Sequence, residues 1–231
     1  KVLEIEGTLI ARGTSSDKIT FTSSAASPAA GDWGYIKFND YGDANVSVPA
    51  TFDGNGDYVS GSILEHCNVE YGGAYGKVVM QATYINYCSF TNNEGTVGNS
   101  GVLDAYFLSS SNVYEHVKIT NSVFTQNVTN KRLIGSIRNA TISENSFTDS
   151  GYVQIIGKNT TTTNNVFTNV DSAWNYGAIL ADIEDGNHLI SNNLIKNTTG
   201  SGIAVAFEYW TPATITITNN TIIGNTNYGI R

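Results

Sequence analysis

Residues 144–170 read ENSFTDSGYVQIIGKNTTTTNNVFTNV, and this stretch contains one phrase twice. In each copy an Asn is followed two residues later by a Phe, and the two rings, Phe147 and Phe167, lie 20 residues apart. Between the copies a Gly opens the run GYVQII (151–156), which has the period-two apolar alternation of a strand. The stretch therefore predicts a repeat that is built from short strands and polar turns.

The same phrase recurs along most of the chain at irregular intervals. Its apolar anchors are, in order, Val69, Phe90, Phe124, Phe147, Phe167, Ile195 and Ile222. Neighbouring anchors are 20 to 34 residues apart, which indicates a unit of fixed core length that carries loops of variable length. A second phrase, in which a Gly leads into alternating apolar residues, follows each anchor. Helical periodicity is sustained nowhere.

Strand repeats of this length without intervening helices are expected to stack on one another. We therefore predict an all-β fold, a right-handed single-stranded parallel β-helix (a solenoid) of about 8–9 coils. Residues 1–231 would form a single β-helix domain, in which 1–60 hold the first coils with long insertions and 61–231 hold the regular repeats. Successive coils would lie about 4.8 Å apart, the usual strand spacing.

An Asn precedes the later anchors at a fixed distance. These residues are Asn145, Asn165, Asn193 and Asn220. Asn tolerates the left-handed conformation that a tight corner needs, and its amide can bond the same amide one coil away. We expect these residues to form a ladder at one corner of the coils.

Composition and charge restrict the possible partners. The chain has 12 Lys and Arg against 20 Asp and Glu, and its net charge is −8. A basic stripe for a nucleic-acid backbone or for membrane attachment is therefore missing. No apolar run approaches the roughly 18 residues that are needed to cross a bilayer. We expect no nucleic-acid partner and no membrane insertion.

Phrases such as ITNNTIIGNTNYGI (217–230) resemble the repeats of pectate-lyase-like parallel β-helix proteins. The opening segments GTLIARGTSSDKITFTS (7–23) and GDWGYIKF (31–38) resemble the first coils of secreted bacterial and archaeal β-helix surface proteins. The resemblance covers nearly the whole chain and implies the fold and a secreted or cell-surface location. It does not imply one activity, because this superfamily includes lyases, hydrolases, adhesins, phage spikes and inert stalks.

The resemblance also directs the search for catalytic residues. Lyases of the superfamily have an Asp cluster around calcium with an Arg or Lys base, whereas hydrolases have several Asp on successive coils. Here the candidate strands carry only Asp104 and Asp182, about 14 Å apart if three coils separate them. Glycosidases place their two carboxyl groups roughly 5 to 10 Å apart. Lys131 and Arg132 are further weak candidates, and the sequence favours a protein that is not an enzyme over a polysaccharide lyase or glycoside hydrolase.

Exposed aromatic residues suggest a different function, because such rings stack on sugars. Tyr75, Tyr176 and Tyr228 each precede a strand Gly, so we expect a discontinuous ladder at one corner. Nearby in the sequence are Trp174, Tyr209 and Trp210. These rings could equally cover an apolar edge. The preferred hypothesis is a non-catalytic structural or adhesive module that binds a polysaccharide or surface glycan on its elongated flank.

A third hypothesis rests on the residue that follows each anchor, which is Thr91, Thr125, Thr148 and Thr168 in four successive repeats. A flat Thr-bearing face is what ice-binding solenoids use. Thr is also common on exposed strands for reasons of propensity alone, and Lys196 interrupts the series.

Two smaller features remain open. DGNGD (53–57) places Asp53, Asn55 and Asp57 at alternate positions, as Ca²⁺ loops do, although an ordinary Gly–Asn turn is favoured. No other cofactor is indicated. Cys67 and Cys88 lie 21 residues apart and should be stacked neighbours, either as a disulfide or as a buried pair of thiols.

The chain begins and ends in strand-like alternation, at KVLEIEG and YGIR. We expect it to be a segment of a longer protein. Its open ends could stack end to end on further β-helix coils.

Overall fold

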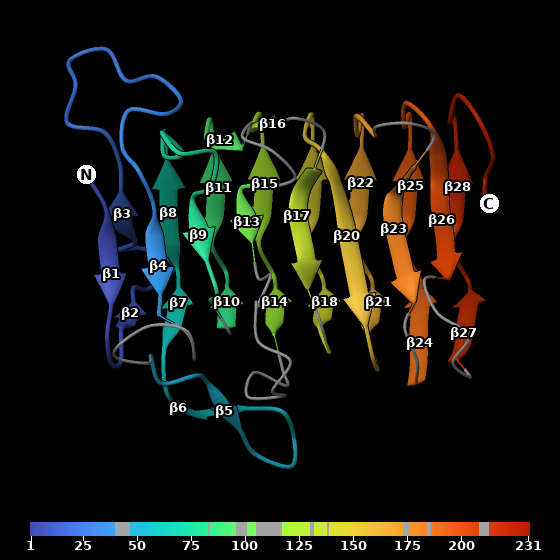
Figure 1. Ribbon diagram of the computed structural model, residues 1–231, viewed down its shortest axis with the longest axis horizontal. Helices are drawn as coiled ribbons and strands as arrows, with labels where there is room; N and C mark the ends of the chain where they lie inside the picture. Colours follow the sequence, from blue (N-terminus) through green and yellow to red (C-terminus); the bar gives the residue numbers. More distant parts are fainter. Residues whose placement is uncertain are drawn as a thin grey trace.

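The computed structural model describes residues 1–39, 47–82, 84–95, 101–104, 117–129, 132–137, 139–172, 176–183, 186–207 and 213–231. Within these ranges every regular element is a β-strand. The strands stack along the long axis of the molecule, and the two termini lie at opposite ends of the stack (Figure 1). Three parallel sheets of eight strands each run the length of this stack.

Sheet A contains the strands that the Gly-led phrases predict. Its order is β1 (Leu3–Ile5), β4 (Ile36–Phe38), β9 (Val79–Met80), β13 (Leu103–Asp104), β17 (Arg132–Ile137), β20 (Tyr152–Gly157), β23 (Gly177–Ile183) and β26 (Ser201–Phe207).

Sheet B precedes the Asn corner. Its order is β2 (Ile10–Arg12), β7 (Ile63–Glu65), β10 (Tyr84–Asn86), β14 (Lys118–Thr120), β18 (Thr141–Ser143), β21 (Thr161–Thr163), β24 (Gly186–Ser191) and β27 (Ala213–Thr218).

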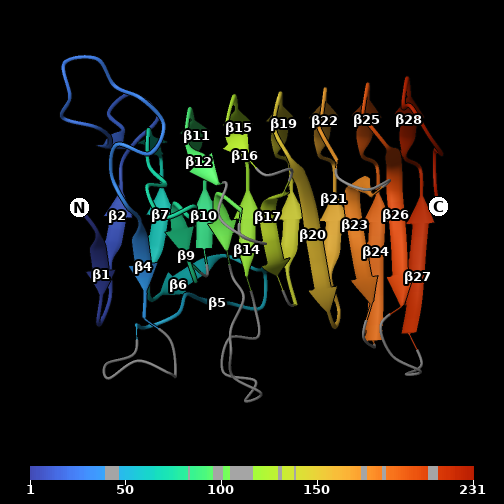
Figure 2. The ribbon, with the colours of Figure 1, turned by 45° about the horizontal axis from the view of Figure 1, so that its top comes forward.

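Sheet C holds the anchors. Its strands are β3 (Ile19–Phe21), β8 (Cys67–Glu70), β11 (Ser89–Thr91), β15 (Val123–Thr125), β19 (Ser146–Thr148), β22 (Val166–Thr168), β25 (Leu194–Lys196) and β28 (Thr221–Ile223). Figure 2 shows its later strands in one row along the upper edge of the stack. The chain visits sheets A, B and C in turn, once per coil, and so completes eight coils. The predicted parallel β-helix of about 8–9 coils is confirmed.

Two short pairs lie outside the three sheets. β5 (Thr51–Phe52) and β6 (Tyr58–Ser60) form an antiparallel hairpin between the first two sheet strands of the second coil. β12 (Glu94–Gly95) pairs in parallel with β16 (Val128–Thr129). The hairpin packs Phe52 and Tyr58 on Tyr84 of sheet B, which gives that outer face a small apolar cluster of its own.

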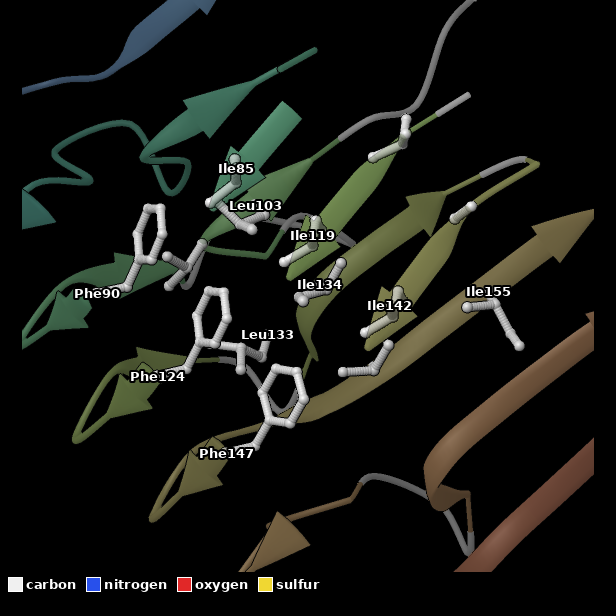
Figure 3. Close-up of a cluster of buried hydrophobic side chains, with 14 of the residues drawn as sticks. Ile85, Phe90, Leu103, Ile119, Phe124, Leu133, Ile134, Ile142, Phe147 and Ile155 are labelled. Atoms are coloured by element: carbon white, nitrogen blue, oxygen red, sulfur yellow. The ribbon is translucent and has the colours of Figure 1, made fainter. Parts of the chain in front are cut away.

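The interior of the coils is a stack of in-register apolar side chains. Phe90, Phe124, Phe147 and Phe167 are fully buried and pair in consecutive strands of sheet C. Their ring centroids are 4.9, 5.0 and 4.6 Å apart from one coil to the next. Figure 3 shows the first three rings facing aliphatic side chains of sheets A and B, such as Leu103 and Ile119. The anchors therefore form the core that the repeat predicts.

The corner between sheets B and C differs from the prediction in one respect. The left-handed residues there are Glu144, Asn164, Asn192 and Asn219, with φ between 54° and 60°. These are the residues immediately before the predicted Asn, so the conformational part of that prediction is wrong. The outward residue makes the turn, and the next Asn points inward, where its amide satisfies buried backbone groups.

The predicted amide ladder itself is confirmed. The side-chain amide of each Asn donates from Nδ2 to Oδ1 of the Asn one coil later, at 2.9 to 3.1 Å. The ladder runs through Asn145, Asn165, Asn193 and Asn220. Toward the N-terminus the same position is held by Ser122, whose Oγ accepts from the backbone N–H of Cys88 at 3.1 Å. A second, shorter ladder joins Asn93 to Asn127 at the corner that follows sheet C.

Cys67 and Cys88 continue the first ladder as free, buried thiols. Cys88 Sγ donates to the carbonyl oxygens of Leu64 and Asn86, each at 3.3 Å. Cys67 Sγ donates to those of Glu65 and Ala11 at 3.4 and 3.5 Å. Of the two alternatives for this pair, the buried thiol stack describes the structure.

Candidate functional site

The outer face of sheet A carries most of the polar residues that could form a site. Along its strands Val153, Ile179 and Ile203 pair in register and are fully buried in the core. The next residue of each strand therefore points outward. Asp104 pairs with Gly135, and Gln154 lies one coil later, where the pairing of β17 with β20 shifts register between Ile134 and Ile137. Asp104 and Gln154 therefore both lie on this outward face, two coils apart.

Asp104 is paired with a cation that sequence analysis did not single out. Lys77 Nζ lies 2.7 Å from Asp104 Oδ2, and the side chain of Asp104 is only 10% exposed. Lys77 stands just before β9, one coil earlier. A charge-assisted bond of this length fixes the carboxylate, so its ionic charge is neutralised locally.

Asp182 is held by an amide. Gln154 Nε2 donates to Asp182 Oδ2 at 2.7 Å, diagonally from β20 to β23. Both side chains are at least nine-tenths buried, with 6% and 9% exposure. The remaining amide oxygen, Gln154 Oε1, is buried and has no hydrogen-bond partner among the described residues. An orphaned acceptor of this kind is rare in folded proteins.

Aromatic and cationic groups border the same face. Arg132 Nε donates to the hydroxyl of Tyr152 at 3.4 Å, and its guanidinium lies 5.9 Å from the centre of that ring. The ring of Tyr152 contacts the ring of Tyr176, with centroids 5.7 Å apart. Tyr152 is 3% exposed and Tyr176 is 38% exposed. Tyr176 therefore exposes an aromatic ring at the start of β23, in contact with Tyr152.

The structure does not bring the two predicted carboxylates together. β17 and β20 lie between the strands of Asp104 and Asp182, a separation of three coils or about 14 Å. Each carboxylate has a different partner, Lys77 or Gln154. Arg132 contacts the hydroxyl and ring of Tyr152, and Lys131 lies outside the described residues. The spacing is wider than that of a glycosidase acid–base pair.

The predicted tyrosine ladder is wrong in register. The residues Val79, Ile179 and Ile230 are aligned by strand pairing. Tyr75 lies four residues before the first of them, Tyr176 three before the second and Tyr228 two before the third. All three rings are exposed at the same side of the coils, at 61%, 38% and 63%, but they do not stack in one row. Trp174, Tyr209 and Trp210 lie outside the described residues.

The predicted Thr row is in register. Thr91, Thr125, Thr148 and Thr168 pair on consecutive strands of sheet C, followed by Lys196. All four are half-buried, and the parallel row beside them is mixed, with Ser89, Val123, Ser146 and Val166. The Thr side chains therefore form a single row, and the neighbouring outward row does not extend it into a wider Thr-bearing face.

The DGNGD segment forms the turn of the β5–β6 hairpin. Asp53 Oδ1 accepts hydrogen bonds from the backbone N–H groups of Asn55 and Asp57 at 2.8 and 2.9 Å. The bonds from Asp57 and Asn55 lower the pKa of Asp53. Lys118 Nζ donates to the carbonyl oxygen of Gly56 at 2.6 Å. An ammonium group thus occupies this carbonyl and backbone donors occupy Oδ1 of the carboxylate, the contacts of an ordinary hairpin turn.

Other candidate sites are small among the described residues. A cavity with room for about 10 Å³ lies between Asp104 and core residues such as Val79, Leu103 and Ile134, close to the minimum for one water molecule. No group of three or more His, Cys, Asp or Glu that could hold a metal ion occurs in the described ranges.

Sequence reasoning missed Lys77, Tyr152 and the central role of Gln154. A single polar residue in a short strand does not form a recognisable sequence motif. Only the register of strand pairing shows which polar residues on different coils contact each other. Aligning GYVQII with GAILAD by their Gly would have placed Gln154 beside Leu180. Its diagonal contact with Asp182 required the structure.

The three parallel sheets, stacked coils and Asn ladder define a parallel β-helix protein. Residues 96–231 match the family described as right handed beta helix region. Because this match covers more than half of the chain, the protein belongs to that family. No curated protein and no solved structure gives a significant match. In the part of the chain that the structure describes, no helix has the length and apolar character of a membrane span.

Proposed function

We propose that the chain is a secreted or cell-surface β-helix module without catalytic activity, which serves as a structural and adhesive element. In this proposal a glycan binds along the outer face of sheet A. The observation that carries the proposal is the exposed ring of Tyr176, which contacts Tyr152, two residues before the buried Gln154 on β20. An aromatic platform next to fixed polar groups is the usual composition of a sugar site.

The distribution of carboxylates supports binding over hydrolysis. Asp104 and Asp182 lie three coils apart, and each is engaged by a separate partner. A polysaccharide lyase or glycoside hydrolase would need acid and base on one glycosidic bond. Incubation with pectin, alginate and related polymers, with and without Ca²⁺, separates the two classes. Product release that disappears in both Asp104→Ala and Asp182→Ala would overturn the proposal.

A pull-down on insoluble polysaccharides, combined with a glycan array, tests binding directly. We expect retention by at least one glycan and a loss of about 2- to 10-fold in Tyr176→Ala, the range for one aromatic contact. Tyr87→Ala is the matched control, because its ring is 48% exposed but stacks on His66 at the corner between sheets B and C. Equal effects of both changes, or no retention by any glycan, would contradict the proposal.

The Thr row of sheet C favours one second candidate, ice binding. Its basis is the in-register series from Thr91 to Thr168, which repeats at the strand spacing of about 4.8 Å. Thermal hysteresis measures this activity. If the row binds ice, Thr148→Tyr should abolish most of the hysteresis, and a wild-type protein without hysteresis removes the candidate.

We also propose that further β-helix coils can stack on the ends of the sheets, where strands such as β1 and β27 have a neighbour on one side only. Unpaired strand edges favour such association. Sedimentation over a range of concentrations would detect it, and monomers at every concentration would count against self-stacking.

A further inference from the structure

Two pairs of tyrosines beside sheet A have the same geometry. Tyr35 contacts Tyr75 with ring centroids 5.9 Å apart and an angle of 65° between the ring planes. Tyr152 contacts Tyr176 at 5.7 Å and 58°. In each pair the first tyrosine lies at the start of a strand of sheet A, and the second lies shortly before a later strand of that sheet, one coil on. The two pairs are therefore copies of one arrangement.

The sequence around the two pairs is also alike. The dipeptide Gly-Tyr occurs in the chain only at 34–35 and 151–152, and a β-branched, fully buried residue follows it in both places. The second tyrosine of each pair is followed by a Gly, at 76 and 177. Gly34 permits the packing of the first pair, because a Cβ at this position would lie 3.2 Å from Tyr75 Cε2. The ring thus rests close to the backbone of the coil before it.

Each pair presents one ring to solvent. Tyr75 is 61% exposed and Tyr176 is 38% exposed. Their partners are less accessible, since Tyr35 is half-buried and Tyr152 is buried. An exposed ring that a second ring holds in place offers a rigid apolar surface, on which the face of a pyranose can stack. Each pair therefore forms a platform that a sugar can reach from solvent.

A charged group of the preceding coil holds the inner ring of each platform. The hydroxyl of Tyr35 donates to Glu4 Oε1 at 3.5 Å. The hydroxyl of Tyr152 accepts from Arg132 Nε at 3.4 Å. Both charged side chains lie toward the outside of the coils, where they are at least partly exposed. They can bond the hydroxyl groups of a sugar that stacks on the neighbouring ring.

The two platforms lie in register along the stack. Ile36 and Val153, which follow the inner tyrosines, belong to one column of paired core residues that runs from β4 to β20. Figure 1 shows β9, β13 and β17 between these strands, so the inner tyrosines are four strand spacings or about 19 Å apart. An extended chain of β-1,4-linked pyranoses advances by about one strand spacing per unit, and alternate units present the same face. Sugars four units apart can therefore stack on both platforms.

We propose that the two tyrosine pairs bind one linear polysaccharide of extended, β-1,4-linked pyranose units, which lies along the stack of coils. The inference rests on the proposed glycan-binding function and adds the class of ligand. That ligand is a chain of at least about five units, the length that reaches from one platform to the other. One molecule on both platforms gains affinity, because its second contact is intramolecular.

Calorimetry with β-1,4-linked glucose, xylose and mannose oligomers tests the inference. For at least one of these sugars the trimer should bind two sites per chain. The hexamer should bind one site per chain, with an affinity at least about fivefold higher than that of the trimer. The matched ligands are maltotriose and maltohexaose, α-linked glucose oligomers that coil. The longer of these two should show no such gain over the shorter.

Two variants each remove one platform. Tyr75→Ala and Tyr176→Ala should each leave one trimer site and bring the hexamer affinity to within about twofold of the trimer affinity. The double variant should bind neither oligomer. Tyr87→Ala is the control, because its exposed ring stacks on His66 at another corner, and it should keep both trimer sites. Near-ultraviolet circular dichroism shows whether the variants fold.

The outcomes separate the inference from the proposed function. A single trimer site, lost in only one of the two variants, would overturn the inference and leave glycan binding intact. Two trimer sites without a gain for the hexamer would do the same, because the platforms would then act separately. Binding that is confined to α-linked oligomers would also overturn the inference alone. Binding of no glycan by the folded protein would overturn both.

Discussion

Asn165 and Asn193 lie on consecutive coils, and one oxygen of Asn193 serves both donors of its neighbour. Oδ1 of Asn193 accepts the backbone N–H of Asn165 and its side-chain amide, each at 3.0 Å. Asn165 Nδ2 also donates to the carbonyl oxygen of Ile142 at 2.9 Å. The side chain thus joins its coil to the coil before it and to the coil after it, which explains why the corner needs Asn.

Replacing Asn165 should therefore destabilise the protein more than replacing Asn164, the residue before it. Asn165 is 1% exposed, so Asn165→Ala leaves the backbone and side-chain N–H groups of Asn145 without their acceptor. We expect a loss of about 2–4 kcal/mol in the free energy of unfolding. The matched control is Asn164→Gly, because Asn164 is exposed and left-handed at φ 58°. The control should change stability by less than about 1 kcal/mol. Similar thermal midpoints for both variants would contradict the ladder's role.

The phenyl stack should tolerate an aliphatic residue better than a small one. Phe147 lies between Phe124 and Phe167, at centroid distances of 5.0 and 4.6 Å, and is fully buried. Phe147→Ala should cost about 3–5 kcal/mol because the core cannot collapse into the gap. Phe147→Leu should cost much less, since Ile195 fills the same row two coils on. Chemical denaturation measures both, and equal losses would contradict packing as the cause.

The fold could be predicted from the sequence because each coil repeats the same pattern of an apolar anchor and a corner residue. Phe124, Phe147 and Phe167 could be placed in the core by their spacing from the Asn phrase alone. The same reasoning failed for Tyr75, Tyr176 and Tyr228, because turns of different length separate a Tyr from the strand that follows it. Only the observed pairing shows that the offsets are four, three and two residues.

The candidate site was less predictable for a related reason. Gln154 and Asp182 meet diagonally across two strands, so neither their separation in sequence nor a motif indicates the contact. The β5–β6 hairpin was expected only as an insertion, and its packing on Tyr84 depends on long-range contacts that local patterns do not contain.

That hairpin leads to a prediction about pH. Tyr84 is 7% exposed, and burial, followed by the charge of Glu65, raises its pKa. Between the ordinary value near 10 and the raised value, the unfolded chain ionises first. Stability should therefore fall as pH rises above about 10. Tyr84→Phe should flatten this part of the stability profile, as followed by urea denaturation at several pH values. Parallel profiles for the two proteins would show that Tyr84 is not responsible.

The DGNGD turn gives a prediction about metal. Lys118 Nζ donates to the Gly56 carbonyl and lies 4.9 Å from the Phe52 ring centre. Because this ammonium holds the turn, Ca²⁺ in millimolar excess should leave the thermal midpoint unchanged. Lys118→Met should lower stability by about 1–2 kcal/mol through loss of the cation–π and hydrogen-bond contacts. A midpoint that rises with Ca²⁺, in the wild type or in Lys118→Met, would restore Asp53, Asn55 and Asp57 as ligands.

The two cysteines should react only when the coils open. Cys67 and Cys88 are 0% and 2% exposed, and each Sγ donates to carbonyl oxygens of its own corner. Burial raises the pKa of Cys88, whereas the hydrogen bond with Cys88 lowers the pKa of Cys67, so the protection of Cys67 rests on its burial alone. The thiolate is the form that reacts with alkylating and disulfide reagents. At pH 8 the folded protein should therefore resist iodoacetamide, whereas denaturant should expose two alkylatable thiols per chain. Cys67→Ser and Cys88→Ser, each with one remaining thiol, identify which group reacts first during partial unfolding. A denatured, unreduced protein that takes up no label and is lighter by two hydrogens would show a disulfide in place of the thiol stack.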